Sequence, residues 1–147
     1  MNMEIYTVGH SNRSLEEFID LLNAFQVKIL VDVRSFPSSK KVPQFNRANL
    51  EKALSLHDII YLWMGDTLGG LRKGGYQAHT LTAEFRAGIE KLKSLLHDRA
   101  AIMCAEKFPW RCHRIYISRE LQNQGIKCIH ILDTQKTWIP KDLTNFF

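Results

Sequence analysis

The chain has 147 residues, which is enough for one ordinary domain with its own hydrophobic core. Hydrophobic residues make up 45% and charged residues 24%, the balance of a soluble globular protein. No apolar run reaches the roughly 18 residues that a transmembrane helix needs, so the composition excludes a membrane span. The formal net charge of +5 fits an anionic partner, such as a nucleotide, a nucleic acid or a phosphorylated metabolite. It fits a plain basic surface equally well.

The N-terminus and the cysteines indicate the compartment. Residues 1–4 lead at once into an apolar run, without the basic and apolar regions of a signal peptide. The three cysteines, Cys104, Cys112 and Cys128, have no spacing typical of a disulfide framework. We therefore expect a cytoplasmic protein with reduced thiols and no membrane partner.

Hydrophobic patterning predicts five strands separated by helices. The strands are expected at 5–8, 29–33, 59–63, 100–104 and 127–132. The helices are expected after the capping box Ser14–Glu17, over 47–56, after Thr82, and over 110–124 with Gly125 behind it. Strands that alternate with helices form a parallel sheet with right-handed crossovers. The sequence thus predicts one α/β domain over 1–147, with a mainly parallel sheet of about five strands flanked by helices in three Rossmann-like layers.

Two loops and the tail interrupt this pattern. The prolines and serines of 36–43 exclude a helix there, and five of the eight glycines lie between Gly65 and Gly75. The tail 133–147 is weakly patterned. Its apolar residues suggest that it packs on the body of the domain or on a second subunit, so a homodimer is possible. These residues are Trp138, Ile139, Phe146 and Phe147.

Polar side chains collect where the expected strands end, which is where sheets of this kind bind ligands. We predict that a ligand there contacts His10, Ser11, Asp32, Arg34, Gly69, Gly70 and Arg114. The glycines allow a backbone to approach a ligand closely or a loop to close over it. Nearby cations could form a nucleic-acid track over the same edge; they are Lys40, Lys41, Arg47, Arg72 and Lys73.

Two charged positions fall inside segments that are expected to be buried. Asp32 shares a strand face with Arg34, so the two form either an ion pair that fixes the loop or a pair that positions a ligand. Arg114 falls on the apolar stripe of the last helix, together with Trp110, Ile117, Ser118 and Leu121. A guanidinium there needs a counter-charge, which could be Glu106, Asp32 or a bound anion.

The segment 103–114 carries the reactive groups. Cys112 lies between Arg111 and His113 near a helix start, so we expect a lowered thiol pKa and a nucleophilic or redox role. Cys104 ends a buried strand and is expected to be a small core residue, although the two thiols could also pair. Glu106 or His113 would be the general acid or base. The spacing matches no standard zinc pattern, so neither a metal nor a cofactor is predicted.

The order of these motifs resembles a known family. Tyr-Thr-Val-Gly-His-Ser, Val-Asp-Val-Arg-Ser-Phe-Pro-Ser-Ser, Met-Gly-Asp-Thr-Leu-Gly-Gly and Cys-Ala-Glu followed by Cys-His-Arg are similar to those of the domain of unknown function 488 family. The resemblance implies a small single-domain intracellular protein and assigns no activity. It marks as motif positions Gly9, His10, Ser11, Asp32, Arg34, Pro37, Gly69, Gly70, Cys104, Glu106, Cys112, His113 and Arg114.

Three functions are compatible with these residues. The first is an enzyme-like domain that binds an anionic, phosphate-bearing ligand between Arg34 and Arg114, with Cys112 as the nucleophile of a covalent reaction. The second is a non-catalytic nucleic-acid-binding module that uses the basic loops. The third is a thiol-redox protein that uses Cys104 and Cys112.

Overall fold

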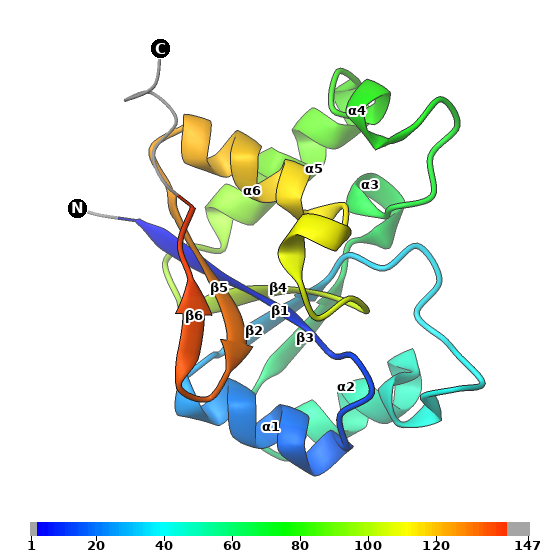
Figure 1. The fold of residues 1–147 in the computed structure, drawn as a ribbon, viewed down its shortest axis with the longest axis vertical. Helices are drawn as coiled ribbons and strands as arrows, with labels where there is room; N and C mark the ends of the chain where they lie inside the picture. The colour runs from blue at the N-terminus through cyan, green and yellow to red at the C-terminus, as the bar shows by residue number, and fades with distance from the viewer. Residues whose placement is uncertain (1–2, 141–147) are drawn as a thin grey trace.

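The computed structural model describes residues 3–140, and these form three layers with a six-stranded sheet in the middle (Figure 1). The strands are β1 (Glu4–Gly9), β2 (Ile29–Asp32), β3 (Ile60–Trp63), β4 (Ala100–Cys104), β5 (Lys127–Asp133) and β6 (Lys136–Trp138). Their order across the sheet is β3-β2-β4-β1-β5-β6, and β1 to β5 run parallel while β6 runs antiparallel to β5. The predicted α/β class with a mainly parallel sheet is confirmed.

Helices cover both faces of the sheet. One face carries α1 (Leu15–Ala24) and α2 (Arg47–Ser55). The other carries α3 (Gly65–Leu68), α4 (Tyr76–His79), α5 (Ala83–Ser94) and α6 (Arg114–Asn123) (Figure 1). Two short 3₁₀ turns, Pro43–Phe45 and Pro109–Arg111, precede α2 and α6. Each face has its own hydrophobic core, and all residues of β2 and β4 are buried between the two.

Local sequence signals set several of these boundaries. The Ser14 hydroxyl accepts the backbone N–H of Glu17, and the Glu17 carboxylate accepts the backbone N–H of Ser14, so the predicted capping box begins α1. Thr82 caps α5 through the backbone N–H of Phe85. Strand β4 has the predicted bounds. The sequence predicts these boundaries correctly because each depends on residues that are close together in the chain.

Two segments differ from the sequence expectation. The glycine-rich stretch contains the one-turn helix α3, and α4 follows directly after it, although glycine disfavours helix. The last helix begins at Arg114 and not at Trp110, because Pro109 to Arg111 form a separate 3₁₀ turn. Trp110 is therefore 52% exposed and does not belong to the core-facing stripe.

The tail adds a sixth strand that the sequence did not indicate. Strand β6 is three residues long and mostly exposed, so it has no hydrophobic alternation to find. Trp138 packs against the rings of His130 and Trp110, whereas Ile139 is exposed. Phe146 and Phe147 lie outside the described residues. Between residues 3 and 140, no helix has the length and apolar character to span a membrane.

The end of β1 lies against the loop that follows β4. The backbone N–H of His10 donates to the Cys104 carbonyl, and that of Ser11 donates to the Ala105 carbonyl, both at 2.9 Å. A Cβ atom on Gly9 would lie 1.7 Å from the carbonyl oxygen of Glu106. Glycine at position 9 therefore allows the backbone contact that holds the start of this loop.

We predict that Gly9→Ala lowers the free energy of unfolding by about 2–4 kcal/mol, because the methyl group meets backbone that cannot move aside. Urea unfolding at equilibrium measures this loss. The matched control is Gly125→Ala, where φ is +85° and, among residues 3–140, no atom lies within 4 Å of an added Cβ. It costs only the backbone strain, about 1–2 kcal/mol. Equal losses at the two positions would contradict the close approach.

Candidate functional site

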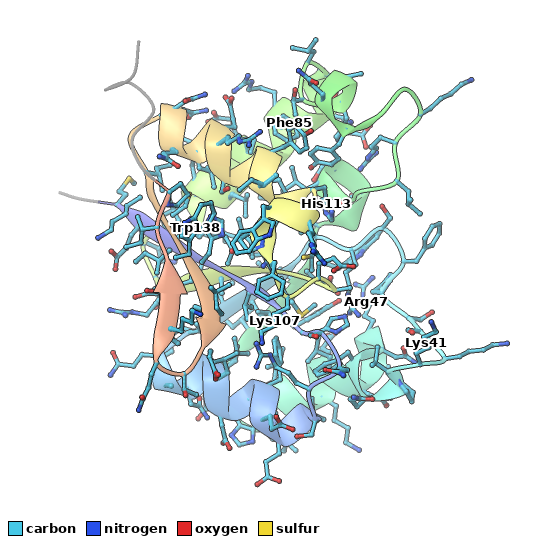
Figure 2. The ribbon with its side chains drawn as sticks, in the orientation of Figure 1. Lys41, Arg47, Phe85, Lys107, His113 and Trp138 are labelled. Carbon is cyan, nitrogen blue, oxygen red and sulfur yellow. The ribbon has the colours of Figure 1, made fainter. Side chains whose placement is uncertain are left out.

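A pocket of about 400 Å³ opens at the carboxyl ends of β2 and β4. The loop after β2, the glycine-rich loop, the loop after β4 and the residues before α6 all contribute to its walls. Five of the predicted site residues line it, together with Cys104; they are Arg34, Gly70, Glu106, Cys112 and His113. In Figure 2, His113 lies where α6 begins, above the ends of the central strands.

The predicted pair of Asp32 and Arg34 is a bidentate ion pair. Asp32 is fully buried and accepts Arg34 Nε at 2.9 Å and Nη2 at 2.7 Å. It also accepts the backbone N–H of Arg34 and the hydroxyl of Tyr61. Arg34 Nη2 donates further to the Phe45 carbonyl at 2.9 Å. Asp32 therefore does not face the pocket, and it fixes the guanidinium that does.

His10 completes the support of Arg34. Its Nδ1 donates to the Ser11 carbonyl at 2.8 Å, so Nε2 carries the lone pair that faces Arg34 Nη1 at 3.4 Å. Burial lowers the pKa of His10 to about 4, and the ring stacks on Phe45. His10 is therefore neutral at pH 7. Within the described chain, only one guanidinium N–H of Arg34, on Nη1, remains free for a ligand.

Of the other predicted ligand-binding residues, His10, Ser11 and Gly69 do not line the pocket, whereas Gly70 does. His10 lies behind Arg34, and the Ser11 hydroxyl faces Asn12 in a residue with a φ of 52°. A Cβ on Gly69 would lie 2.3 Å from Ser35 Oγ, and one on Gly70 would lie 2.7 Å from His113 Nδ1. The close approach predicted at these glycines is thus made by the protein's own side chains.

Arg114 lies beneath the pocket and is fully buried, as its helical position predicted. Its Nη1 lies 3.4 Å from Cys104 Sγ, and Nη2 donates to the Lys107 carbonyl at 2.8 Å. Neither expected carboxylate is its partner, because Asp32 pairs with Arg34 and Glu106 is exposed at the pocket rim. Among residues 3–140, the Nε atom of Arg114 has no acceptor and the guanidinium forms no ion pair with a carboxylate. Within the described residues, the guanidinium of Arg114 contacts the sulfur of Cys104 and the Lys107 carbonyl, and a bound anion remains the third expected counter-charge.

The sequence predicted a lowered pKa at Cys112, but in the structure it is Cys104 whose thiol pKa is lowered. Burial raises the pKa of Cys104, but the hydrogen bond with Cys112 and the charge of Arg114 outweigh burial and lower it below its ordinary value. The hydrogen bond with Cys104, together with burial, raises the pKa of Cys112. The expectation of a low pKa at Cys112 is therefore wrong. The helix begins after Cys112, and the guanidinium of Arg114 faces Cys104 instead.

His113 is a neutral base beside Cys112. Its Nε2 lies 2.8 Å from the Val33 carbonyl, which fixes the proton on Nε2 and leaves the Nδ1 lone pair 3.5 Å from Cys112 Sγ. Burial lowers the pKa of His113 in spite of the hydrogen bond with Val33. The imidazole therefore presents an unprotonated nitrogen to the sulfur of Cys112.

Of the cations expected to form a nucleic-acid track along this edge, two arginines already contact other parts of the protein. Arg72 donates to the carbonyls of Gly69, Gly65 and Asp66 and pairs with Glu84, so it holds the glycine-rich loop. Arg47 stacks over the rings of Tyr61 and Trp63, at 5.9 Å and 5.2 Å from their centres. Lys41 is exposed on the loop after β2, apart from His113 (Figure 2).

Sequence reasoning assigned no role to Tyr61, Phe45 or Ser35, which hold the residues around the pocket, although Ser35 lies within a motif that it singled out. It also missed the apolar rim of the pocket, which Phe36 and Leu71 form and in which both are 72% exposed. The signal in the sequence was a large apolar residue within each of two polar, lysine- and arginine-containing loops. Within the described range, no group of three or more His, Cys, Asp or Glu side chains could hold a metal ion.

We predict that Asp32→Asn lowers the free energy of unfolding by about 3–5 kcal/mol, because it leaves the buried Arg34 without its counter-charge. Tyr61→Phe removes a single hydrogen bond to the same carboxylate and costs about 1 kcal/mol. Chemical denaturation of the two variants beside the parent gives both values. If Asp32→Asn cost no more than Tyr61→Phe, the ion pair would not be what orders this part of the site.

The comparisons with known proteins give a family and no activity. A family model described as Domain of unknown function DUF488 matches residues 14–121, which is most of the chain. No curated protein and no solved structure matches the chain. The matched range contains the ion pair of Asp32 and Arg34 and the whole segment from Cys104 to Arg114. The chain belongs to the DUF488 family.

Proposed function

We propose that this protein is an enzyme that binds an anionic, phosphate-bearing ligand in the pocket at the carboxyl ends of β2 and β4, with Cys104 as its nucleophile. One observation carries the proposal. Arg114 is fully buried against the sulfur of Cys104, at 3.4 Å, and pairs with no carboxylate among residues 3–140. This contact supports Cys104, and not Cys112, as the covalent residue of the proposed reaction.

The charge of Arg114 supports a thiolate at Cys104. A buried guanidinium without a counter-charge is strongly unfavourable, and a neighbouring thiolate removes that penalty. The thiolate is also the nucleophilic form of cysteine. Cys104 is one of the residues that line the pocket, although only 1% of it is exposed, so the proposal places the ligand directly against it.

Positive groups around the same pocket favour an anion. Arg34 presents its free Nη1 N–H there, and the exposed Arg111 contributes to the wall. The N-terminus of α6 begins at the pocket and adds its partial positive charge. A phosphate group satisfies such donors better than a neutral ligand does.

The aromatic surroundings favour a nucleotide or a nucleic acid over a simple phosphate ester. The Phe36 side chain lines the pocket and is exposed. Trp110, on the turn that also carries Arg111, stacks on Phe108 with ring centres 5.1 Å apart. Flat exposed rings beside cations stack on bases while the cations contact phosphates.

Proton transfer in this proposal uses His113 and Glu106. The neutral Nδ1 of His113 accepts a proton at the pocket wall, and the Glu106 carboxylate lies at the exposed rim where product leaves. A reactive thiolate needs a reducing compartment, so we place the protein in the cytoplasm.

The test is whether an anion in the pocket protects Cys104. We predict that pyrophosphate, or a short single-stranded oligonucleotide, slows alkylation of Cys104 by iodoacetamide at least about tenfold at saturation. Arg111→Gln should weaken this protection, and Cys104→Ser should keep the binding measured by calorimetry. Cys128, which is buried away from the pocket, gives the unprotected reference in the same sample.

Two outcomes would contradict the proposal. Alkylation of Cys104 that no phosphate-bearing probe slows would show that the pocket is not the anion site. Oligonucleotide binding that falls steeply with salt, while the reactivity of Cys104 does not change, would favour a non-catalytic nucleic-acid-binding module instead.

A further inference from the structure

The pocket contains a second sulfur that the proposed function does not use. Cys112 lines the same pocket as Cys104, and both sulfur atoms contact Arg114. The backbone N–H of Arg114 lies 3.5 Å from Cys112 Sγ, while the guanidinium of the same residue lies against Cys104 Sγ. A single residue thus places both sulfurs, and neither is in a disulfide.

The surroundings give the two sulfurs different roles. Cys104 has the guanidinium of Arg114 beside it, which stabilises the negative sulfur. Cys112 has the lone pair of His113 Nδ1 at 3.5 Å, which accepts its proton when it reacts. One thiolate that attacks first and one thiol that can attack it afterwards, with a base at hand, are the parts of a two-cysteine redox site.

We propose that the pocket also reduces small hydroperoxides, with Cys104 as the sulfur that attacks the peroxide and Cys112 as the thiol that resolves it. This inference rests on the thiolate of Cys104 in the proposed function, and it does not depend on the phosphate-bearing ligand.

The first step oxidises Cys104. Its thiolate attacks the terminal oxygen of the hydroperoxide, an S–O bond forms and the O–O bond breaks. The sulfur loses two electrons, and the peroxide leaves as an alkoxide or hydroxide that takes a proton and becomes an alcohol or water. Arg34, with one free guanidinium N–H at the pocket, can donate to the departing oxygen. Cys104 is now a sulfenic acid.

The second step closes a disulfide. The sulfur of Cys112 attacks the sulfur of Cys104 and gives up its proton to His113 Nδ1. The S–O bond breaks, and the hydroxide takes that proton and leaves as water. Two equivalents of a low-molecular-weight thiol then reduce the disulfide to two thiols and are themselves joined as a disulfide. The cycle consumes one hydroperoxide and returns the pocket to its starting state.

Cys128 is the matched control in the same chain. It is buried under α6, where its thiol faces the Ser118 carbonyl at 3.4 Å, and burial raises its pKa to about 12. Its sulfur hydrogen-bonds to the carbonyls of Ser118 and Ile126, and burial alone accounts for its raised pKa, with no contribution from an arginine or a second cysteine in the part of the chain that the structure describes. Cys128→Ser should therefore leave the reaction unchanged.

The experiment treats the reduced full-length protein with hydrogen peroxide and follows intact mass and non-reducing peptide maps. We expect a single disulfide between Cys104 and Cys112 in the parent chain and in Cys128→Ser. Cys112→Ser should stop at a sulfenic acid on Cys104, which dimedone traps, and Cys104→Ser should react at least about tenfold more slowly. A parent chain in which peroxide forms no such disulfide, or in which Cys104→Ser reacts as fast as the parent, overturns the inference.

Alkylation of Cys104 by iodoacetamide, measured at neutral pH on the same preparations, separates the two proposals. If Cys104 alkylates fast but peroxide forms no disulfide, the redox inference is wrong and the thiolate of the proposed function stands. If Cys104 alkylates no faster than Cys128, the thiolate itself is absent and both proposals fail. If anions do not protect Cys104 but the disulfide forms, only the phosphate-bearing ligand is wrong.

Discussion

A guanidinium in the protein interior, held against a sulfur atom, is the interaction on which this site depends. Arg114 is the first residue of α6 and is fully buried, with Nη1 at 3.4 Å from Cys104 Sγ and Nη2 on the Lys107 carbonyl. Burying such a charge without a partner is strongly unfavourable. The proposed thiolate at Cys104 would relieve this cost, and in that proposal the buried charge selects Cys104 as the reactive cysteine.

Arg34, the second buried arginine at this pocket, differs from Arg114 because a carboxylate neutralises it. Arg34 is also buried, but Asp32 neutralises it through two hydrogen bonds, and His10 and the Phe45 carbonyl take up further N–H groups. Because burial keeps His10 neutral, it adds no charge to this cluster. Arg34 is therefore a fixed donor, whereas Arg114 has no carboxylate partner among residues 3–140 and lies against the sulfur of Cys104. The pocket thus combines a rigid donor, Arg34, with a buried positive charge that lowers the pKa of the Cys104 thiol.

The sequence predicted those features that depend on spacing along one element. The capping box at Ser14, the bounds of β4 and the inward position of Arg114 all follow from local signals or from helical periodicity. The partner of Arg114 cannot be predicted in this way, because Cys104 belongs to strand β4 and meets Arg114 only in the folded chain. The assignment of the low pKa to Cys112 depended on a helix that starts at Trp110, and the 3₁₀ turn at Pro109 moves that start to Arg114.

The most direct measurement is the pH dependence of the rate at which iodoacetamide alkylates Cys104, read by peptide mass spectrometry on the folded protein. The account predicts a midpoint below the ordinary thiol pKa of about 8.5, and an upward shift of at least about one pH unit in Arg114→Gln. Arg119→Gln, which removes an exposed arginine from the same helix, should leave the midpoint in place. A midpoint at or above 8.5 that does not respond to Arg114→Gln would contradict the account.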